Sequence, residues 1–260
     1  MLSTLTRGLP RSLPGGEKVR VHPRWRSMSW NLLEYAAFKA AILQGGCLLD
    51  VGANVGAYSL LMGQWVGPKG HVYAFEPNPY VADGLALHVS LNGLEDRITV
   101  VRKAVCDRQR KCEFSFGDSI GNGHLIDTNE THPPSKQVVV ETTSLDEFCR
   151  LGRIHPQFIK VDVEGAEFEV LQGAKGLIRS WSHGLKLFVE LHPTVWKAQG
   201  RSKEDWIVLL DRLSLKMVPI APGFDPWSLE GVCVELIPNR KPGEEGQKGS
   251  PRKGGRDGTE

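Results

Sequence analysis

Apolar runs and amphipathic stretches alternate through the middle of the chain. Continuous apolar runs of about four to eight residues are typical of buried strands, and apolar positions that recur every three or four residues are typical of helices. Gly45-Gly46 and Gly67-Pro68 mark two of the junctions. Strands are expected over residues 47–51, 71–76, 98–105, 112–116, 137–145, 158–163, 185–191, 216–221 and 231–237, and helices over 28–43, 57–66, 80–91, 168–178 and 202–213.

This alternation predicts an α/β fold with a doubly wound, mostly parallel sheet. The last two strands are separated by a short connection and are expected to close the sheet as an antiparallel pair. Ligands of such sheets bind at the carboxyl ends of the strands. Residues 28–238 are predicted to form this domain, flanked by a flexible basic N-terminal arm over 1–27 and a glycine-rich, disordered tail over 239–260.

Composition excludes few classes of function. The 260 residues are 40% hydrophobic and carry a net charge of +2, which offers no argument for a nucleic acid as partner. No apolar run reaches the roughly 18 residues of a membrane-spanning helix. Five cysteines without a CxxC pair argue against a disulfide framework or zinc site and for a reducing compartment. A cytoplasmic location is expected, although the Arg-rich N-terminus leaves organelle targeting open. The oligomeric state cannot be predicted from these features.

The segment LLDVGANVG places an acid and two glycines at the end of the first buried strand. Asp50 lies in the strand, and Gly52, Asn54 and Gly56 follow before a helix. Gly52 permits a tight turn, and Gly56 allows the backbone to approach a ligand. The helix N-terminus beyond them suits a carboxylate or a phosphate. The segment lacks the middle glycine of the dinucleotide motif GxGxxG, which weakens a nicotinamide-cofactor interpretation.

Glu76 ends the second strand, 24 residues after Gly52. A carboxylate there can accept hydrogen bonds from both ribose hydroxyls of an adenosine cofactor. S-adenosylmethionine fits the other features as well, since its ammonium suits Asp50 and its carboxylate suits the loop from Gly52 to Gly56. We therefore predict S-adenosylmethionine as the cofactor.

Five motifs occur in one order between about residues 30 and 195: LLDVGANVG, YAFEPNP, KAVCD, FIKVDVEGAEFEVLQGA and FVELHP. With these motifs the chain resembles the FkbM-type methyltransferases, and the DVEGAE stretch is the most specific match. The resemblance implies a class I, S-adenosylmethionine-dependent fold. It also implies methylation of an oxygen atom on a sugar, polyketide, lipid or other small molecule.

The resemblance also assigns roles by position. It assigns Asn78 to adenosine contact, and Ala104 and Val105 to the flanks of the adenine ring. Residues 117–125 lie where family members carry a Ser/Gly-rich loop, although His124 does not fit that pattern. The complete set of cofactor-binding candidates is Asp50, Gly52, Asn54, Gly56, Glu76, Asn78, Ala104 and Val105.

Methyl transfer to a hydroxyl requires side chains that position the acceptor and take its proton. Asp162 and Glu190 are expected to end adjacent strands, and His192 titrates in the useful range. Oxygen ligands of this kind can bind Mg²⁺, but nothing fixes their spacing, so no metal is predicted. The catalytic candidates are Asp162, Glu164, Glu190 and His192.

Several neighbouring residues receive other interpretations. Glu167 and Glu169 are interpreted as the charged start of a helix, where negative charge suits the helix dipole and solvent. Glu34, inside the apolar stripe of residues 28–43, either reaches water or faces the site. Trp196 is a candidate for the wall of the acceptor pocket.

The leading hypothesis is an S-adenosylmethionine-dependent O-methyltransferase that acts on a small-molecule hydroxyl. Two alternatives remain open at this point. One is an NAD-linked oxidoreductase, and the other is a module that binds S-adenosylmethionine without catalysing a reaction.

Overall fold

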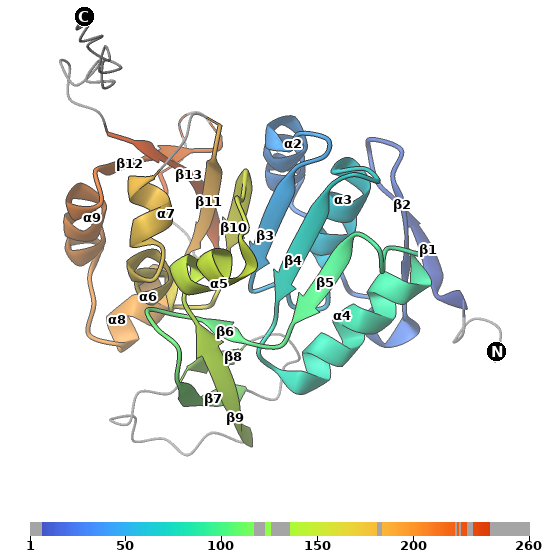
Figure 1. Ribbon diagram of the computed structural model, residues 1–260, viewed down its shortest axis with the longest axis horizontal. Helices are drawn as coiled ribbons and strands as arrows, with labels where there is room; N and C mark the ends of the chain where they lie inside the picture. Colours follow the sequence, from blue (N-terminus) through green and yellow to red (C-terminus); the bar gives the residue numbers. More distant parts are fainter. Residues whose placement is uncertain are drawn as a thin grey trace, which may run out of the picture.

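A seven-stranded sheet forms the centre of the structure, which is a computed structural model (Figure 1). Its strands are β3 (Cys47–Val51), β4 (His71–Phe75), β5 (Ile98–Val101), β10 (Phe158–Val161), β11 (Lys186–Leu191), β12 (Leu215–Pro219) and β13 (Val232–Pro238). The strand order is β12-β13-β11-β10-β3-β4-β5. Strands β11, β10, β3, β4 and β5 run parallel, and β13 is antiparallel to both β11 and β12. The predicted doubly wound, mostly parallel α/β sheet with an antiparallel closing strand is confirmed. The structure describes residues 7–116, 123–125, 136–180, 184–221, 223, 225–227 and 231–239.

Helices cover both faces of this sheet. One face packs against α2 (Leu32–Ala41), α3 (Ala57–Trp65) and α4 (Pro79–Leu91). The other face packs against α5 (Leu145–Gly152), α6 (Glu167–Gln172), α7 (Lys175–Arg179), α8 (Pro193–Ala198) and α9 (Lys203–Arg212). The helix expected over 168–178 is thus two short helices, and α5 and α8 were not predicted. Among the described residues, no helix is long and apolar enough to cross a membrane.

The alternation of side chains along the strands collects charged groups on one face. Successive residues of a strand point to opposite faces of the sheet. Asp50 of β3 pairs in register with Lys160 of β10, and Lys160 pairs with Phe188 of β11. Glu190 lies two residues after Phe188 and therefore points to the same side. Asp50, Lys160 and Glu190 thus share the face that α2 and α3 cover.

A smaller sheet carries the remaining part of the site. It contains β6 (Ala104–Val105), β7 (Lys111–Phe116), β8 (Gly123–Leu125) and β9 (Lys136–Thr143), in the order β6-β9-β7-β8. Figure 1 shows it beyond the carboxyl ends of β4 and β5. The single strand expected over 98–105 is wrong, because the chain turns at Lys103, whose N–H donates to the Val101 carbonyl at 2.9 Å. Of the loop predicted over 117–125, only β8 falls within the described residues.

The N-terminal segment is folded, so the predicted flexible arm is wrong for residues 9–25. It forms the hairpin of β1 (Leu9–Ser12) and β2 (Lys18–Val21), followed by the short 3₁₀ helix η1 (Pro23–Trp25). Val19 and Val21 alternate with basic residues and are fully buried. His88 of α4 holds the segment in place: its Nε2 accepts the His22 N–H at 3.0 Å, and its Nδ1 donates to the Val55 carbonyl at 2.7 Å. The predicted tail lies outside the described residues beyond position 239.

Candidate functional site

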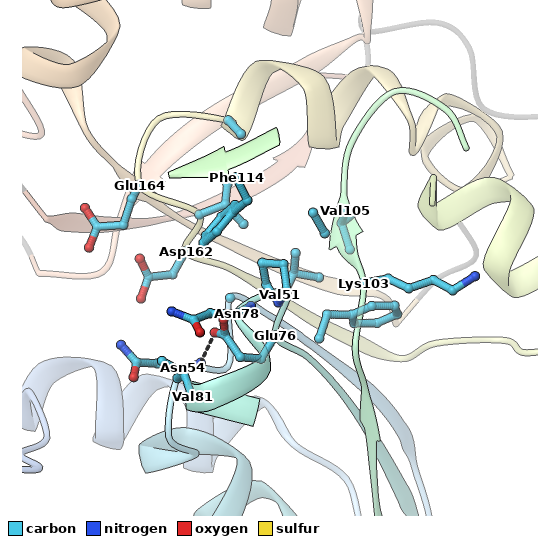
Figure 2. A pocket seen from close by; sticks show the side chains of 16 residues that line it. Val51, Asn54, Glu76, Asn78, Val81, Lys103, Val105, Phe114, Asp162 and Glu164 are labelled. Atoms are coloured by element: carbon cyan, nitrogen blue, oxygen red, sulfur yellow. Dashed lines mark hydrogen bonds between the residues drawn. The ribbon is translucent and has the colours of Figure 1, made fainter. Parts of the chain in front are cut away.

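Two adjoining pockets open at the carboxyl ends of β3, β4 and β10. Gly52, Asn54 and Asp162 line both of them. Figure 2 shows the first pocket, with the carboxylates of Asp162 and Glu164 projecting to the same side. The second pocket is bounded by the segment after η1 and by the start of α3, with the lining residues Trp25, Ser27, Met28, Ser29, Asp50, Ala53, Val55, Ala57, Tyr58 and Lys160.

Glu76 lies at the centre of the first pocket and is almost completely buried. Its Oε2 accepts the Asn54 N–H at 3.0 Å, and its Oε1 accepts the Asn78 N–H at 2.8 Å (Figure 2). Burial raises the pKa of Glu76 to about 7, although the two backbone donors act in the opposite direction. The structure therefore holds this carboxylate in one orientation, with oxygen lone pairs left for hydroxyl donors.

Asp50 is buried with one oxygen unsatisfied. Its Oδ2 accepts a hydrogen bond from the Ser59 hydroxyl at 2.5 Å, whereas its Oδ1 has no partner among the described residues. Burial raises the pKa of Asp50, and the neighbouring charge of Lys160 opposes that shift. A buried oxygen without a partner is costly, so Oδ1 is suited to a donor that arrives with a ligand.

The two glycines of the loop are required by close packing. A Cβ on Gly52 would lie 1.6 Å from the Asp162 carbonyl oxygen, and one on Gly56 would lie 2.4 Å from Leu85 Cδ1. Both residues also have positive φ angles, of 82° and 93°. Gly52 makes the tight turn that the sequence predicts. Gly56 meets Leu85 of α4, so packing explains this glycine without a ligand.

An apolar wall completes the first pocket. Ala104 and Val105 of β6 line it, together with Phe75, Val81 and Phe114. Sequence reasoning missed Phe114, because it lies on β7, in the smaller sheet, and nothing in its local sequence indicates that β7 reaches the pocket. These side chains can hold a flat, apolar ring next to Glu76.

The four catalytic candidates meet at the ends of β10 and β11. His192 Nε2 lies 3.5 Å from Glu164 Oε2, 3.9 Å from Asp162 Oδ1 and 4.0 Å from Glu190 Oε1. The imidazole is only 6% exposed, whereas the three carboxylates are 20–36% exposed. The prediction that Asp162 and Glu190 end adjacent strands is confirmed by the pairing of β10 with β11.

Glu167 contacts Nδ1 of His192 and fixes the orientation of the ring. The interpretation of Glu167 as a solvent-facing helix start is therefore wrong. Its side chain is completely buried. Glu167 Oε1 lies 2.8 Å from His192 Nδ1 and accepts the Gly165 N–H at 3.0 Å, and Oε2 accepts the Trp196 Nε1–H at 2.6 Å. Trp196 is also fully buried, stacked on Trp206, so it does not line an acceptor pocket. Glu169, by contrast, forms a partly exposed ion pair with Arg201.

The charges of the cluster are strongly coupled. Burial lowers the pKa of His192, but the Glu167 hydrogen bond and the nearby carboxylates outweigh burial and raise it to about 9. Burial and the charge of Asp162 raise the pKa of Glu190 to about 8. Burial favours the neutral form of Asp162, but Lys160 outweighs it and lowers the pKa of that carboxyl.

Lys160 is the buried cation of the site, and sequence reasoning did not assign it a role. Its Nζ lies 2.9 Å from Asp162 Oδ2. Burial lowers the pKa of Lys160, but the carboxylates of Asp162, Asp50 and Glu190 outweigh burial and raise it above its ordinary range. A lysine inside the apolar strand FIKV was the available signal, because lysine is rarely buried without a partner.

Glu34 of α2 faces the site. Its side chain is buried and hydrogen-bonded to Tyr58, and Lys160 and Asp162 are close enough to shift its pKa. Burial raises the pKa of Glu34. Of the two interpretations that its sequence position allowed, the structure supports the one in which it faces the site.

The family model for the methyltransferase FkbM domain matches residues 50–216, which is more than half of the chain. The chain belongs to the FkbM methyltransferase family. The resemblance inferred from its motifs is thus confirmed, and so is S-adenosylmethionine as the cofactor, because FkbM methyltransferases depend on it. The NAD-linked oxidoreductase loses its support.

Two curated relatives carry methyltransferase names. The hexuronic acid methyltransferase AglP of Haloferax volcanii is 32% identical over 151 residues, which are 57% of this chain and 56% of that protein. Methyltransferase sdnD of Sordaria araneosa is 27% identical over 156 residues, which are 48% of this chain and 59% of that protein. The chain thus spans a little over half the length of the curated relatives it matches.

A solved structure is similar at a lower level. The fibrillarin of Aeropyrum pernix in complex with S-adenosyl-L-methionine has a TM-score of 0.48 and 14% identity, covering 90% of this chain and 84% of that one. The assignment of this chain to the FkbM family does not depend on this likeness.

The residues of the FkbM site fit S-adenosylmethionine. Glu76 presents oriented carboxylate oxygens for the ribose hydroxyls. The unsatisfied Asp50 Oδ1 suits the ammonium group, and the apolar wall that includes Ala104 and Phe114 suits the adenine ring. Asn78 lines the same pocket, and its contact with adenosine stays a prediction.

Proposed function

We propose that this FkbM protein transfers the methyl group of S-adenosylmethionine to a hydroxyl oxygen of a small molecule. The observation that carries the proposal is the position of Asp162. This residue lines both pockets, and its neighbours Glu190 and His192 bring further titratable groups to the same edge. When bound, the cofactor supplies an activated methyl group, so the protein has to place the acceptor and remove its proton.

The chemistry of the cluster favours a hydroxyl over a carboxylate acceptor. A carboxylate is already ionised at neutral pH and would be repelled by the carboxylates of Asp162 and Glu164. A hydroxyl donates a hydrogen bond to such oxygens and gives up its proton to them as the new bond forms. We assign the roles of acceptor positioning and proton removal to Asp162, Glu164, Glu190 and His192.

The second pocket supports a small acceptor. Trp25, Met28 and Tyr58 give it aromatic and apolar walls, and Ser27 and Ser29 provide polar groups. The relative named as a hexuronic acid methyltransferase suggests a sugar acid as one acceptor class to test. A sugar acid carries both hydroxyl and carboxylate oxygens. Methylation of a hydroxyl gives an ether and methylation of the carboxylate gives an ester, so the product shows which oxygen accepted the methyl group.

The test is incubation with methyl-labelled S-adenosylmethionine and a panel of sugars, sugar acids and cell extracts. We expect label in a product that survives mild alkali, as an ether does, rather than label released as methanol from an ester. His192→Ala and Asp162→Asn are expected to lower kcat by about a hundredfold, with a much smaller effect on the affinity for S-adenosylhomocysteine.

His155→Ala is the matched control, because His155 is exposed on a loop away from the cluster. It should keep the wild-type rate. An alkali-labile product, or wild-type kcat in both cluster variants, would contradict the proposal.

A further inference from the structure

We propose that Asp162, Glu190 and His192 form a binding site for a divalent cation of the Mg²⁺ or Mn²⁺ type. One ligand atom from each of the three residues lies within 4.8 Å of the others. Two ligands of an octahedral ion at about 2.1 Å are about 3 Å apart when adjacent and about 4.2 Å apart when opposite. His192 Nε2 lies 3.9 Å from Asp162 Oδ1 and 4.0 Å from Glu190 Oε1, so small side-chain rotations bring the three atoms to an ion.

The buried histidine distinguishes this site from a surface cluster of acids. His192 Nδ1 lies 2.8 Å from the buried carboxylate of Glu167, which therefore requires the proton on Nδ1. A cation that binds here displaces the Nε2 proton, and the lone pair of Nε2 then points toward the carboxylate oxygens. The nearest of them, Glu164 Oε2, is 3.5 Å away, at the limit of a hydrogen bond.

Glu167 also resembles the outer-shell carboxylates of metal sites. A histidine that binds a metal usually donates its other N–H to a carboxylate, which fixes the tautomer and the orientation of the ring. Glu167 has this position, and its own orientation is fixed by Gly165 N–H and Trp196 Nε1–H. Helix α6 and helix α8 thus hold the imidazole from the side opposite to the carboxylates.

Lys160 does not occupy the same oxygen. It contacts Asp162 Oδ2 at 2.9 Å, whereas Asp162 Oδ1 is the oxygen that faces His192. Asp162 can therefore neutralise the lysine with one oxygen and bind a cation with the other. Glu164 Oε2 lies on the same side of the imidazole, within reach as a further ligand.

The site adjoins the two pockets rather than filling them. Asp162 lines both, but Glu190 and His192 line neither. Partial exposure of Asp162 and Glu190 leaves coordination positions for water and for acceptor oxygens. If the proposed function holds, the ion binds the acceptor hydroxyl and lowers its pKa. Binding of the ion itself does not depend on that function.

The test is titration of the full-length, metal-free protein with Mn²⁺, with the free ion followed by electron paramagnetic resonance. Wild type should bind about one equivalent, competitively with Mg²⁺. His192→Ala and the isosteric Glu190→Gln should weaken binding by more than about tenfold, and Glu167→Gln by about tenfold through the imidazole orientation. Glu204→Gln, on the exposed side of α9, is the matched control and should bind as wild type.

Circular dichroism of each variant confirms that the fold is retained, and Glu190→Gln is the decisive variant if His192→Ala unfolds. No stoichiometric Mn²⁺ binding by folded wild type, or equal binding by wild type and Glu190→Gln, would overturn the site. Stoichiometric binding without any methyl transfer would contradict the proposed function and leave the ion site in place. Full methyl transfer by metal-free protein that binds no Mn²⁺ would overturn the ion site and leave the proposed function in place.

Discussion

At the scale of single residues, Glu76 connects the sequence to the cofactor most directly. Its carboxylate is fixed by two backbone N–H groups, and burial raises its pKa to about 7. The ionised form is the one that accepts hydrogen bonds from both ribose hydroxyls. Cofactor affinity should therefore be nearly complete at pH 8 and should fall through pH 7 as Glu76 takes up a proton.

This pH dependence can be measured with S-adenosylhomocysteine. For a single group with a pKa of about 7, the dissociation constant should rise about tenfold between pH 8 and pH 6. Glu76→Gln removes the titrating group, so its weaker binding should show a much smaller change over this range. An equal pH dependence in Glu76→Gln and wild type would assign the effect to another group, such as Asp50.

Residues at strand ends were predictable from the sequence, and residues that act through packing were not. Asp50, Glu76 and Asp162 follow or end apolar strands, which places them at one edge of a parallel sheet. Glu167 lies in the first turn of a helix, where an acid usually meets solvent. Its burial depends on Trp196, which is distant in sequence, and local patterns contain no information about that contact.

At the scale of elements, the hairpin of β1 and β2 is the main addition to the expected fold. Val21 is fully buried, next to the His22 N–H that binds His88. Val21→Ala removes two buried methyl groups and leaves a cavity, so it should lower the free energy of unfolding by about 2 kcal/mol.

Chemical denaturation measures this difference. Lys18→Ala is the control, because Lys18 points to solvent from the same strand and should change the stability by less than about 0.5 kcal/mol. If Val21→Ala is as stable as the control, the hairpin does not pack in solution as it does in the structure.

The missed elements share a physical cause. In β2 the apolar positions are only Val19 and Val21, among basic residues, so a two-residue period over four positions was too short to recognise. In the run from Ile98 to Val105, apolar residues lie on both sides of Arg102 and Lys103, and alternation alone allowed one strand through them. The break after Val101 is set by the pairing of β6 with β9, a contact that local sequence does not encode.

At the scale of the whole molecule, the residues that the family model matches do not include all the residues that line the two pockets. The match begins at residue 50, whereas Trp25 and Met28 in the second pocket come from the segment before it. This segment is fixed to the cofactor loop through His88, which bonds to Val55. We therefore expect the N-terminal segment to contribute to the choice of acceptor, and the matched region to contribute the cofactor site.

The central claim is that S-adenosylmethionine binds through Glu76 of the first pocket and Asp50 of the adjoining second pocket. Calorimetric titration with S-adenosylhomocysteine tests this claim most directly. Wild type should bind about one equivalent, NADH should not bind, and Glu76→Ala should weaken binding by about tenfold or more, as expected for the loss of charged hydrogen bonds. Glu95→Ala, at an exposed position, should bind as wild type. Absence of S-adenosylhomocysteine binding by folded wild-type protein, or wild-type affinity in Glu76→Ala, would contradict the account.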